Sequence, residues 1–126
     1  MDLNQVTIRA ADVAACTEFY CALGLRLIVD SRPRYVRFEC PDGGSTCSIH
    51  QVDGATATGG TVIYFECDDL DERVARLKGS GVEFDSDPED TRWLWREARL
   101  RDPAGHLICL FRAGDNRRHP PWRVGD

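Results

Sequence analysis

The stretch Arg101-Asp102-Pro103-Ala104-Gly105-His106 predicts a tight turn near the C-terminal end of the chain. The proline ring presets φ for a turn, the aspartate side chain accepts bonds from nearby backbone amides, and Gly105 tolerates a positive φ. Apolar segments at 93–100 and 107–111 lie on either side of the turn. We therefore predict a β-hairpin at this place.

A weaker copy of the same hairpin pattern lies in the first half of the chain. The stretch Cys40-Pro41-Asp42-Gly43-Gly44 separates apolar segments at 35–39 and 46–52. When the two halves are superposed, residues 6–12 match residues 63–69 at an offset of 57. Such self-similarity indicates a duplicated supersecondary unit.

The duplication predicts one domain over residues 1–112, built from two modules. The modules run over about 3–53 and 61–112, and the small, glycine-rich segment 54–60 joins them. Residues 113–126 form a tail in this interpretation. The Pro-Pro-Trp part of the tail is too apolar for a simply solvated end, so it either clamps a partner subunit or covers the ligand site. A disordered end is the alternative.

The first module is predicted to contain a strand, a helix and three further strands. Alternating residues at 3–9 indicate the first strand. Asp12 is placed to cap a helix over 13–23, and Gly24 stands where a helix-ending glycine belongs. The remaining strands are expected at 25–29, 34–40 and 46–52.

The second module is predicted to repeat this order. A strand at 61–67 precedes Asp69 and Glu72, which have the spacing of a capping box. The helix that follows is expected to end at Gly79 and Gly81. A short strand at 82–84, a polar loop at 85–92 and strands at 93–101 and 107–112 complete the set.

Composition excludes several classes of protein. The chain has 126 residues, 42% of them apolar and 29% charged, and a formal net charge of −5, which argues against nucleic acid as a partner. No apolar run approaches the length of a membrane span. The six cysteines are scattered and no export signal precedes them, so we expect free thiols and a cytoplasmic protein. The cysteines are Cys16, Cys21, Cys40, Cys47, Cys67 and Cys109.

The order and spacing of these motifs resemble the vicinal oxygen chelate superfamily of glyoxalases, bleomycin-resistance proteins and extradiol dioxygenases. The resemblance is carried by Val6-Thr7-Ile8, Asp12 and Phe19-Tyr20 in the first half, and by residues 63–70 and 102–106 in the second. It implies an α+β fold of two βαβββ modules, whose strands form a curled, funnel-shaped mixed half-barrel with the helices outside. It also implies a homodimer, because relatives cover exposed strand edges by dimerising.

Metal-dependent members of the superfamily place one ligand on the first and last strand of each module. The resemblance transfers those positions to Gln5, Ser48, Val62 and Cys109. Valine cannot ligate, and a cysteine ligand normally acts with other cysteines or histidines. We therefore predict no metal and no other cofactor. A displaced divalent-metal site around His50, with Glu66 and Glu97, is the alternative.

Strand alternation divides the side chains between a core face and a ligand face. The core face is expected to hold Val6, Ile8, Val36, Phe38, Ile49, Ile63, Phe65, Ala98, Leu100, Ile108 and Leu110. The ligand face is expected to bind through Gln5, Arg9, His50, Tyr64, Trp93, Trp95, Arg99 and Cys109. Polar groups among aromatic surfaces suit a small planar or anionic molecule.

The same ligand-face residues have a second interpretation as internal contacts. Arg9 can pair with Glu66, and Arg99 with Glu97 or Glu39, because cross-strand charge pairs are common. The tryptophans can equally be core or dimer-interface residues.

Two hypotheses for the function follow. The first is metal-independent binding of a small molecule. The second is a lyase, isomerase or dioxygenase that uses a displaced metal or acid–base residues such as His50 and Glu97. Cys109 is a candidate nucleophile if His50 serves as its base, and otherwise an ordinary small buried residue.

Overall fold

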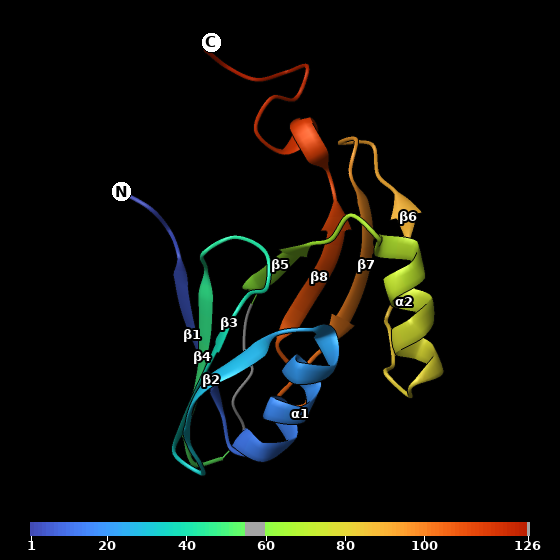
Figure 1. Ribbon diagram of the computed structural model, residues 1–126. Coiled ribbons are helices and arrows are strands. Elements are labelled where there is room, and N and C mark those ends of the chain that lie inside the picture. The colour runs from blue at the N-terminus through green and yellow to red at the C-terminus, as the bar shows by residue number, and fades with distance from the viewer. Residues whose placement is uncertain (55–59, 126) are drawn as a thin grey trace. The chain divides into compact units, whose positions relative to one another are not determined.

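The computed structural model describes residues 1–54 and 60–125 (Figure 1). The expected linker at 54–60 therefore lies mostly outside the described residues. The chain divides into two compact units, Met1–Gly60 with Asp102–His106, and Thr61–Arg101 with Leu107–Asp126. Among the described residues, no helix has both the length and the apolar character that crossing a membrane would need.

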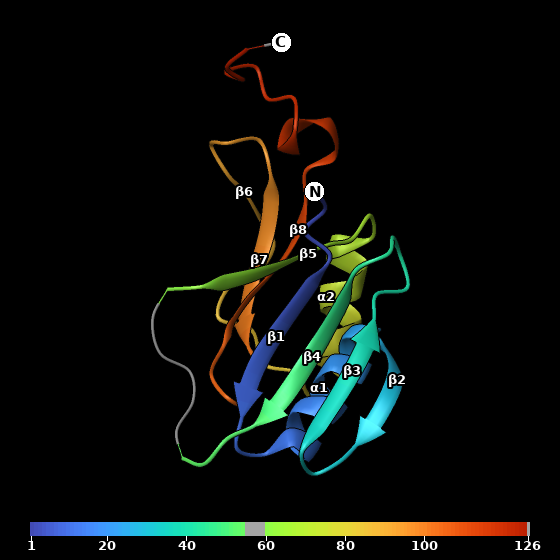
Figure 2. The same cartoon turned by 90° about the vertical axis from the view of Figure 1, so that its left-hand side faces the viewer.

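The first unit contains one mixed sheet and one helix. The elements follow the order β1 (Gln5–Ala10), α1 (Val13–Leu23), β2 (Arg26–Ser31), β3 (Tyr35–Glu39) and β4 (Thr46–Gln51). The strand order in the sheet is β1-β4-β3-β2, in which β1 runs parallel to β4 and the other pairs are antiparallel. Helix α1 contacts β2, β3 and β4 on one face of this sheet (Figure 2).

The second unit repeats this architecture. It contains β5 (Val62–Glu66), α2 (Leu70–Gly79), the two-residue strand β6 (Glu89–Asp90), β7 (Arg96–Arg101) and β8 (Leu107–Arg112), followed by the 3₁₀ helix η1 (Gly114–Arg117). The strand order is β5-β8-β7-β6, with β5 parallel to β8. The prediction of two βαβββ modules is confirmed, and neither four-stranded sheet closes into a barrel.

Helix α1 begins and ends as its sequence predicts. The Asp12 carboxylate accepts a hydrogen bond from the Ala15 backbone N–H at 3.0 Å, which satisfies one of the free donors of the first turn. Gly24 has φ of 111°, a left-handed conformation that strains other residues, and its N–H bonds to the last carbonyls of the helix.

The start of α2 differs from the predicted capping box. Asp69 occupies the N-cap position, but its side chain makes no capping hydrogen bond. Its carboxylate instead accepts a bond from Arg73 at 3.0 Å and lies 3.8 Å from Arg76. A charge-assisted bond to a guanidinium is stronger than one to a neutral amide, and this explains the exchange of partners.

The predicted strand at 82–84 is wrong, and the short strand of this unit is β6, inside the predicted polar loop. The backbone N–H groups of this region have other partners. The Val82 N–H bonds to the Leu77 carbonyl at the end of α2. The N–H groups of Asp85 and Ser86 both bond to the Arg99 carbonyl. A regular ladder to β7 therefore starts only at Glu89, which pairs with Glu97.

The core follows the predicted alternation with three exceptions. Ile8, Val36, Phe38 and Ile49 are buried in the first unit, and Ala98, Leu100, Ile108 and Leu110 in the second. Val6 was predicted to be buried but is 36% exposed, and it lies near the start of the edge strand β1, whose later residues Ile8 and Ala10 are buried. Ile63 and Phe65 are only half-buried on β5, the edge strand of the second sheet.

The turn at Asp102–His106 belongs by its contacts to the first unit. The buried Asp102 carboxylate accepts bonds from the Tyr20 hydroxyl at 2.6 Å and from the backbone N–H groups of Ala104 and His106. Its Oδ2 also lies 2.8 Å from Nδ1 of His106. The turn is thus a hydrogen-bonded loop closed on its own aspartate and tied to α1.

Candidate ligand-binding site

A connected polar network covers the face of the first sheet opposite α1. Ser48 on β4 is fully buried, and its hydroxyl accepts a bond from Gln5 at 2.9 Å and shares one with the Tyr35 hydroxyl at 2.6 Å. Arg37 donates to the Tyr35 oxygen at 3.0 Å. The bond with Ser48 is the main cause that lowers the pKa of Tyr35, and the bond from Arg37 acts in the same direction. The network holds Gln5 and Tyr35 in fixed orientations.

Arg9 and His50 lie side by side on this face. They occupy paired positions of the parallel strands β1 and β4, and both side chains are exposed. The polar network described above does not include them. They are available to a ligand, but neither is held in place for one.

A buried carboxylate organises the corresponding face of the second sheet. Glu97 on β7 is only 6% exposed and accepts bonds from the Trp93 indole N–H at 2.9 Å and from Nη2 of Arg99 at 3.0 Å. The interpretation that Arg99 pairs with Glu97 is therefore confirmed. The pairing leaves 40% of the Arg99 side chain exposed, and the guanidinium carbon lies 5.9 Å from the centre of the Tyr64 ring.

Three aromatic side chains pack together beside this pair. Trp95 stacks on Phe111 with ring centres 4.7 Å apart, and Tyr64 meets both rings edge-on. Tyr64 remains largely exposed, whereas Phe111 is buried. Sequence reasoning missed Phe111, although alternation along β8 places it on the same face as Leu107 and Cys109.

Trp93 and Trp95 lie in a turn and not in a strand, contrary to the prediction of a strand over 93–101. The N–H of Thr91 bonds to the carbonyl of Trp95 at 2.8 Å, and the N–H of Leu94 bonds to the carbonyl of Thr91. Leu94 has φ of 70°, the only positive value at a non-glycine residue in the described part of the chain. The turn brings Trp93 over Glu97 and Trp95 over Phe111.

Cys109 lacks the properties of a nucleophile. Its side chain is fully buried, and burial, followed by the nearby Glu97 carboxylate, raises its pKa to about 12. The thiol is therefore protonated at neutral pH, and the thiolate is the reactive form. This geometry favours the interpretation of Cys109 as a small core residue.

The four superfamily metal positions are a poor donor set in this chain. Val62 offers only hydrocarbon, and Cys109 is a buried thiol without other cysteines or histidines in a metal-binding group with it among the described residues. The Ser48 hydroxyl is shared between Gln5 and Tyr35, and the Gln5 side-chain oxygen accepts a bond from Thr46. Across residues 1–54 and 60–125, no group of three or more His, Cys, Asp or Glu side chains has a geometry that would hold a metal ion.

The predicted site residues fall into separate groups within each unit. The second unit brings together Tyr64, Trp93, Trp95, Glu97, Arg99 and Cys109. In the first unit Gln5 joins Ser48, and Arg9 lies beside His50. Glu66, offered as a partner for Arg9, instead accepts bonds from the backbone of Ala113 and Gly114.

Comparison with known proteins agrees with this repeated architecture. Residues 2–110 match the model of the Glyoxalase/Bleomycin resistance protein/Dioxygenase superfamily. The chain belongs to this superfamily. Comparison with curated protein sequences gives no match.

Solved structures of the superfamily share the fold at low sequence identity. A glyoxalase/bleomycin resistance protein/dioxygenase from Nocardioides is 21% identical, with a TM-score of 0.78 over 99% of this chain and 90% of that one. A lactoylglutathione lyase from Agrobacterium tumefaciens is 20% identical, with a TM-score of 0.73 over 88% and 92%. A bleomycin-binding protein complexed with bleomycin is 21% identical, with a TM-score of 0.71 over 89% and 98%. At these identities the likeness shows the fold alone.

Proposed function

We propose that the protein binds a small, planar, anionic molecule without a metal, on the face of the second sheet that carries Tyr64, Trp95 and Arg99. The observation that carries the proposal is the orientation and exposure of the Arg99 guanidinium. Glu97 uses one of its nitrogens and orients the guanidinium beside the Tyr64 ring, while much of the side chain stays exposed. An oriented guanidinium suits a carboxylate or sulfonate, and it loses less entropy on binding than a free one.

The aromatic side chains supply the apolar part of this site. Trp95 and Tyr64 are held against Phe111, so their exposed surfaces need no rearrangement to meet a flat ligand. The bleomycin-binding structure supports small-molecule binding by this fold, because that protein holds bleomycin. Metal independence is supported by the donor set of this chain, in which Val62 removes one ligand and the Ser48 hydroxyl is bonded to Gln5 and Tyr35.

The proposal is tested by calorimetric titration of the full chain in EDTA with 2-naphthalenesulfonate, and with bleomycin as a second probe. Arg99→Gln removes the charge but keeps a donor for Glu97, and we expect the affinity for the naphthalenesulfonate to fall by about tenfold or more. Arg101→Gln is the matched control, because Arg101 lies two residues further on β7 and pairs with Asp85. The control should bind like the parent protein.

Metal analysis separates binding from the enzymatic alternative. We expect less than one equivalent of zinc, nickel, iron or manganese in protein purified without chelator. One tightly bound equivalent that is lost on replacing Gln5 or His50 would contradict metal-independent binding. Equal affinities of the Arg99→Gln and Arg101→Gln variants would contradict the assignment of the site.

A further inference from the structure

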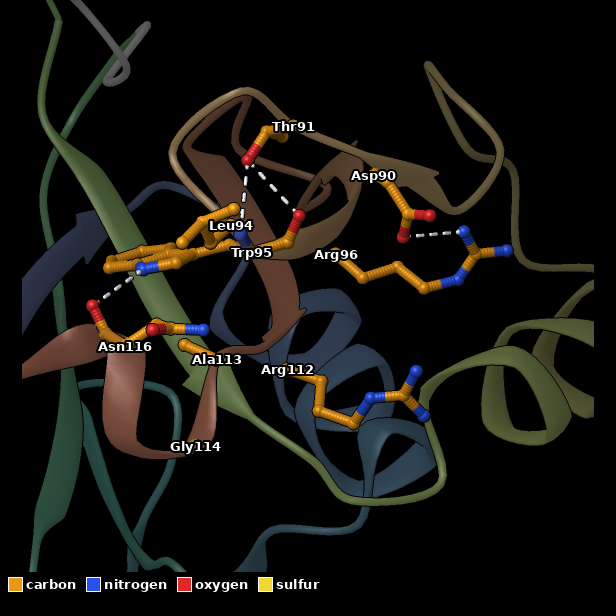
Figure 3. Close-up of a pocket in the computed structure, with 9 residues that line it drawn as sticks. All are labelled: Asp90, Thr91, Leu94, Trp95, Arg96, Arg112, Ala113, Gly114 and Asn116. Atoms are coloured by element: carbon orange, nitrogen blue, oxygen red, sulfur yellow. Dashed lines mark hydrogen bonds and ion pairs between the residues drawn. The ribbon is translucent and has the colours of Figure 1, made fainter. Parts of the chain in front are cut away.

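A cavity of about 540 Å³ opens at one end of the second unit (Figure 3). It lies between the turn that precedes β7 and the helix η1, and its walls include Leu94, Trp95, Arg96, Arg112 and Asn116. Its volume falls within the range of small-molecule sites in proteins. Of the residues assigned to the proposed function, only Trp95 lines it.

Two arginines face each other across the strands beside this cavity. Arg96 on β7 and Arg112 on β8 occupy directly paired positions, and both side chains line the cavity. Like charges at directly opposite positions of a sheet repel each other. Nearby carboxylates must therefore offset this repulsion. They pair with Arg96 but not with Arg112.

Arg96 is fully paired. Its Nε and Nη2 bond to the two oxygens of Asp71 at 2.8 and 3.0 Å, and its Nη1 bonds to Asp90 at 3.0 Å. These bonds lower the pKa of Asp71 and raise that of Arg96. All three guanidinium nitrogens donate to carboxylates, so the positive charge of Arg96 is already matched by Asp71 and Asp90.

Arg112 is not paired in this way. In the described part of the chain no carboxylate lies within ion-pair distance of its guanidinium. Asp71 is near enough to feel its charge, but both Asp71 oxygens are bonded to Arg96. Arg112 thus lines the cavity with a guanidinium that no carboxylate of the described residues pairs with, and a guanidinium can bind a carboxylate bidentately.

The opposite wall is apolar and held in an unusual conformation. Leu94 has φ of 70° and is 47% exposed, and the bonds between Thr91 and Trp95 hold the turn that carries it. Trp95 beside it is fixed by stacking on Phe111 and by its indole N–H, which points to the Asn116 carbonyl (Figure 3). A branched residue in the left-handed region is strained, and such strain concentrates at binding sites.

We propose that this cavity is a second binding site, which takes a small aromatic monocarboxylate with its carboxylate on Arg112 and its ring against Leu94 and Trp95. A single negative charge suits the site better than a phosphate. Asp71 and Asp90 lie close by and would repel a dianion. The site shares Trp95 with the Arg99 face, but its charged group is Arg112, and it does not depend on the function proposed for that face.

The test is an NMR titration of the ¹⁵N-labelled full chain with 1-naphthoate, and with the neutral 1-naphthamide as its isostere. The Trp95 indole resonance is assigned from its loss in Trp95→Phe. We expect 1-naphthoate to shift this resonance and the backbone amides of residues 112–116, and to bind about tenfold or more tightly than the amide.

Three variants separate this site from its surroundings. Arg112→Gln should lower the affinity for 1-naphthoate about tenfold, whereas Arg99→Gln should leave the shifts of residues 112–116 unchanged. Leu94→Gly relieves the positive φ, so it should keep or raise the melting temperature while weakening binding. A purely structural role of Leu94 predicts no loss of binding.

Three results would overturn the proposal. The first is equal affinity for 1-naphthoate and 1-naphthamide, and the second is unchanged affinity in Arg112→Gln. The third is a titration in which the perturbed resonances lie around Tyr64 and Arg99 and not around residues 112–116. That third result would instead support the function proposed for the Arg99 face.

Discussion

At the scale of single residues, Asp102 is a buried side chain with several hydrogen-bond partners. Its buried carboxylate has the Tyr20 hydroxyl, two backbone N–H groups and the His106 ring as partners. Tyr20 and Asp102 are separated by 82 positions in the chain, and the bond between them joins α1 to the hairpin turn. Burial, followed by the Asp102 carboxylate, raises the pKa of Tyr20, so its hydroxyl remains a donor.

Replacing Tyr20 by phenylalanine should therefore lower the free energy of unfolding by about 1–3 kcal/mol, because a buried acceptor loses a donor. Urea denaturation at neutral pH measures this. Tyr35→Phe is the matched control, since the Tyr35 hydroxyl makes two hydrogen bonds but lies on a partly exposed face. An equal loss in the free energy of unfolding for Tyr35→Phe and Tyr20→Phe would show that the bond to Asp102 stabilises the fold no more than the Tyr35 bonds do.

At the scale of elements, both helices end at a left-handed glycine. Helix α1 stops at Gly24, whose φ of 111° lets its N–H reach back to the carbonyls of the last turn. Helix α2 ends at Gly79, and Gly81 beyond the cap Ser80 has φ of 100° and donates to the Lys78 carbonyl. The left-handed glycines are thus Gly24 and Gly81, whereas Gly79 is an ordinary helical residue.

A pair of alanine substitutions tests this difference. Gly24→Ala places a Cβ in the left-handed region and should lower the free energy of unfolding by about 1–2 kcal/mol. Gly79→Ala meets no atom within 4 Å and should be neutral or stabilising by up to about 1 kcal/mol. Thermal unfolding of both variants measures the two effects. Destabilisation by Gly79→Ala equal to that by Gly24→Ala would contradict the role given to the left-handed glycine.

At the scale of the whole molecule, each sheet leaves two edge strands, β1 and β2 in the first and β5 and β6 in the second. Exposed edges are a liability that proteins commonly cover by assembly. The edge strands β1 and β2 also carry exposed apolar side chains, Val6 and Ile28.

We therefore expect a homodimer, the commonest closed assembly. Light scattering during size-exclusion chromatography at micromolar concentration should give twice the chain mass of 14.2 kDa. A mass of 14.2 kDa that does not change with concentration would contradict this expectation.

The sequence by itself determined the repeated βαβββ order, the two hairpins and the ends of α1. These features rest on short-range physics. Alternation and helical spacing identify strands and helices, Asp12 and Gly24 act within one turn of the helix, and the Asp102–Gly105 pattern acts within one turn of the chain. Superfamily membership follows from that order, and the family model confirms it.

The tertiary structure alone decided which side chains meet. Asp69 could cap α2 or bind Arg73, and only the folded chain shows the second. Nothing in the sequence distinguishes Arg96 from Arg112. In the structure, Asp71 and Asp90 pair with Arg96, and Arg112 lines the cavity without such a pair. Leu94 carried no signal at all, because its strain comes from the turn around it. Partners of charged and polar groups depend on distances of a few ångströms between residues far apart in the chain, and strand periodicity does not encode those distances.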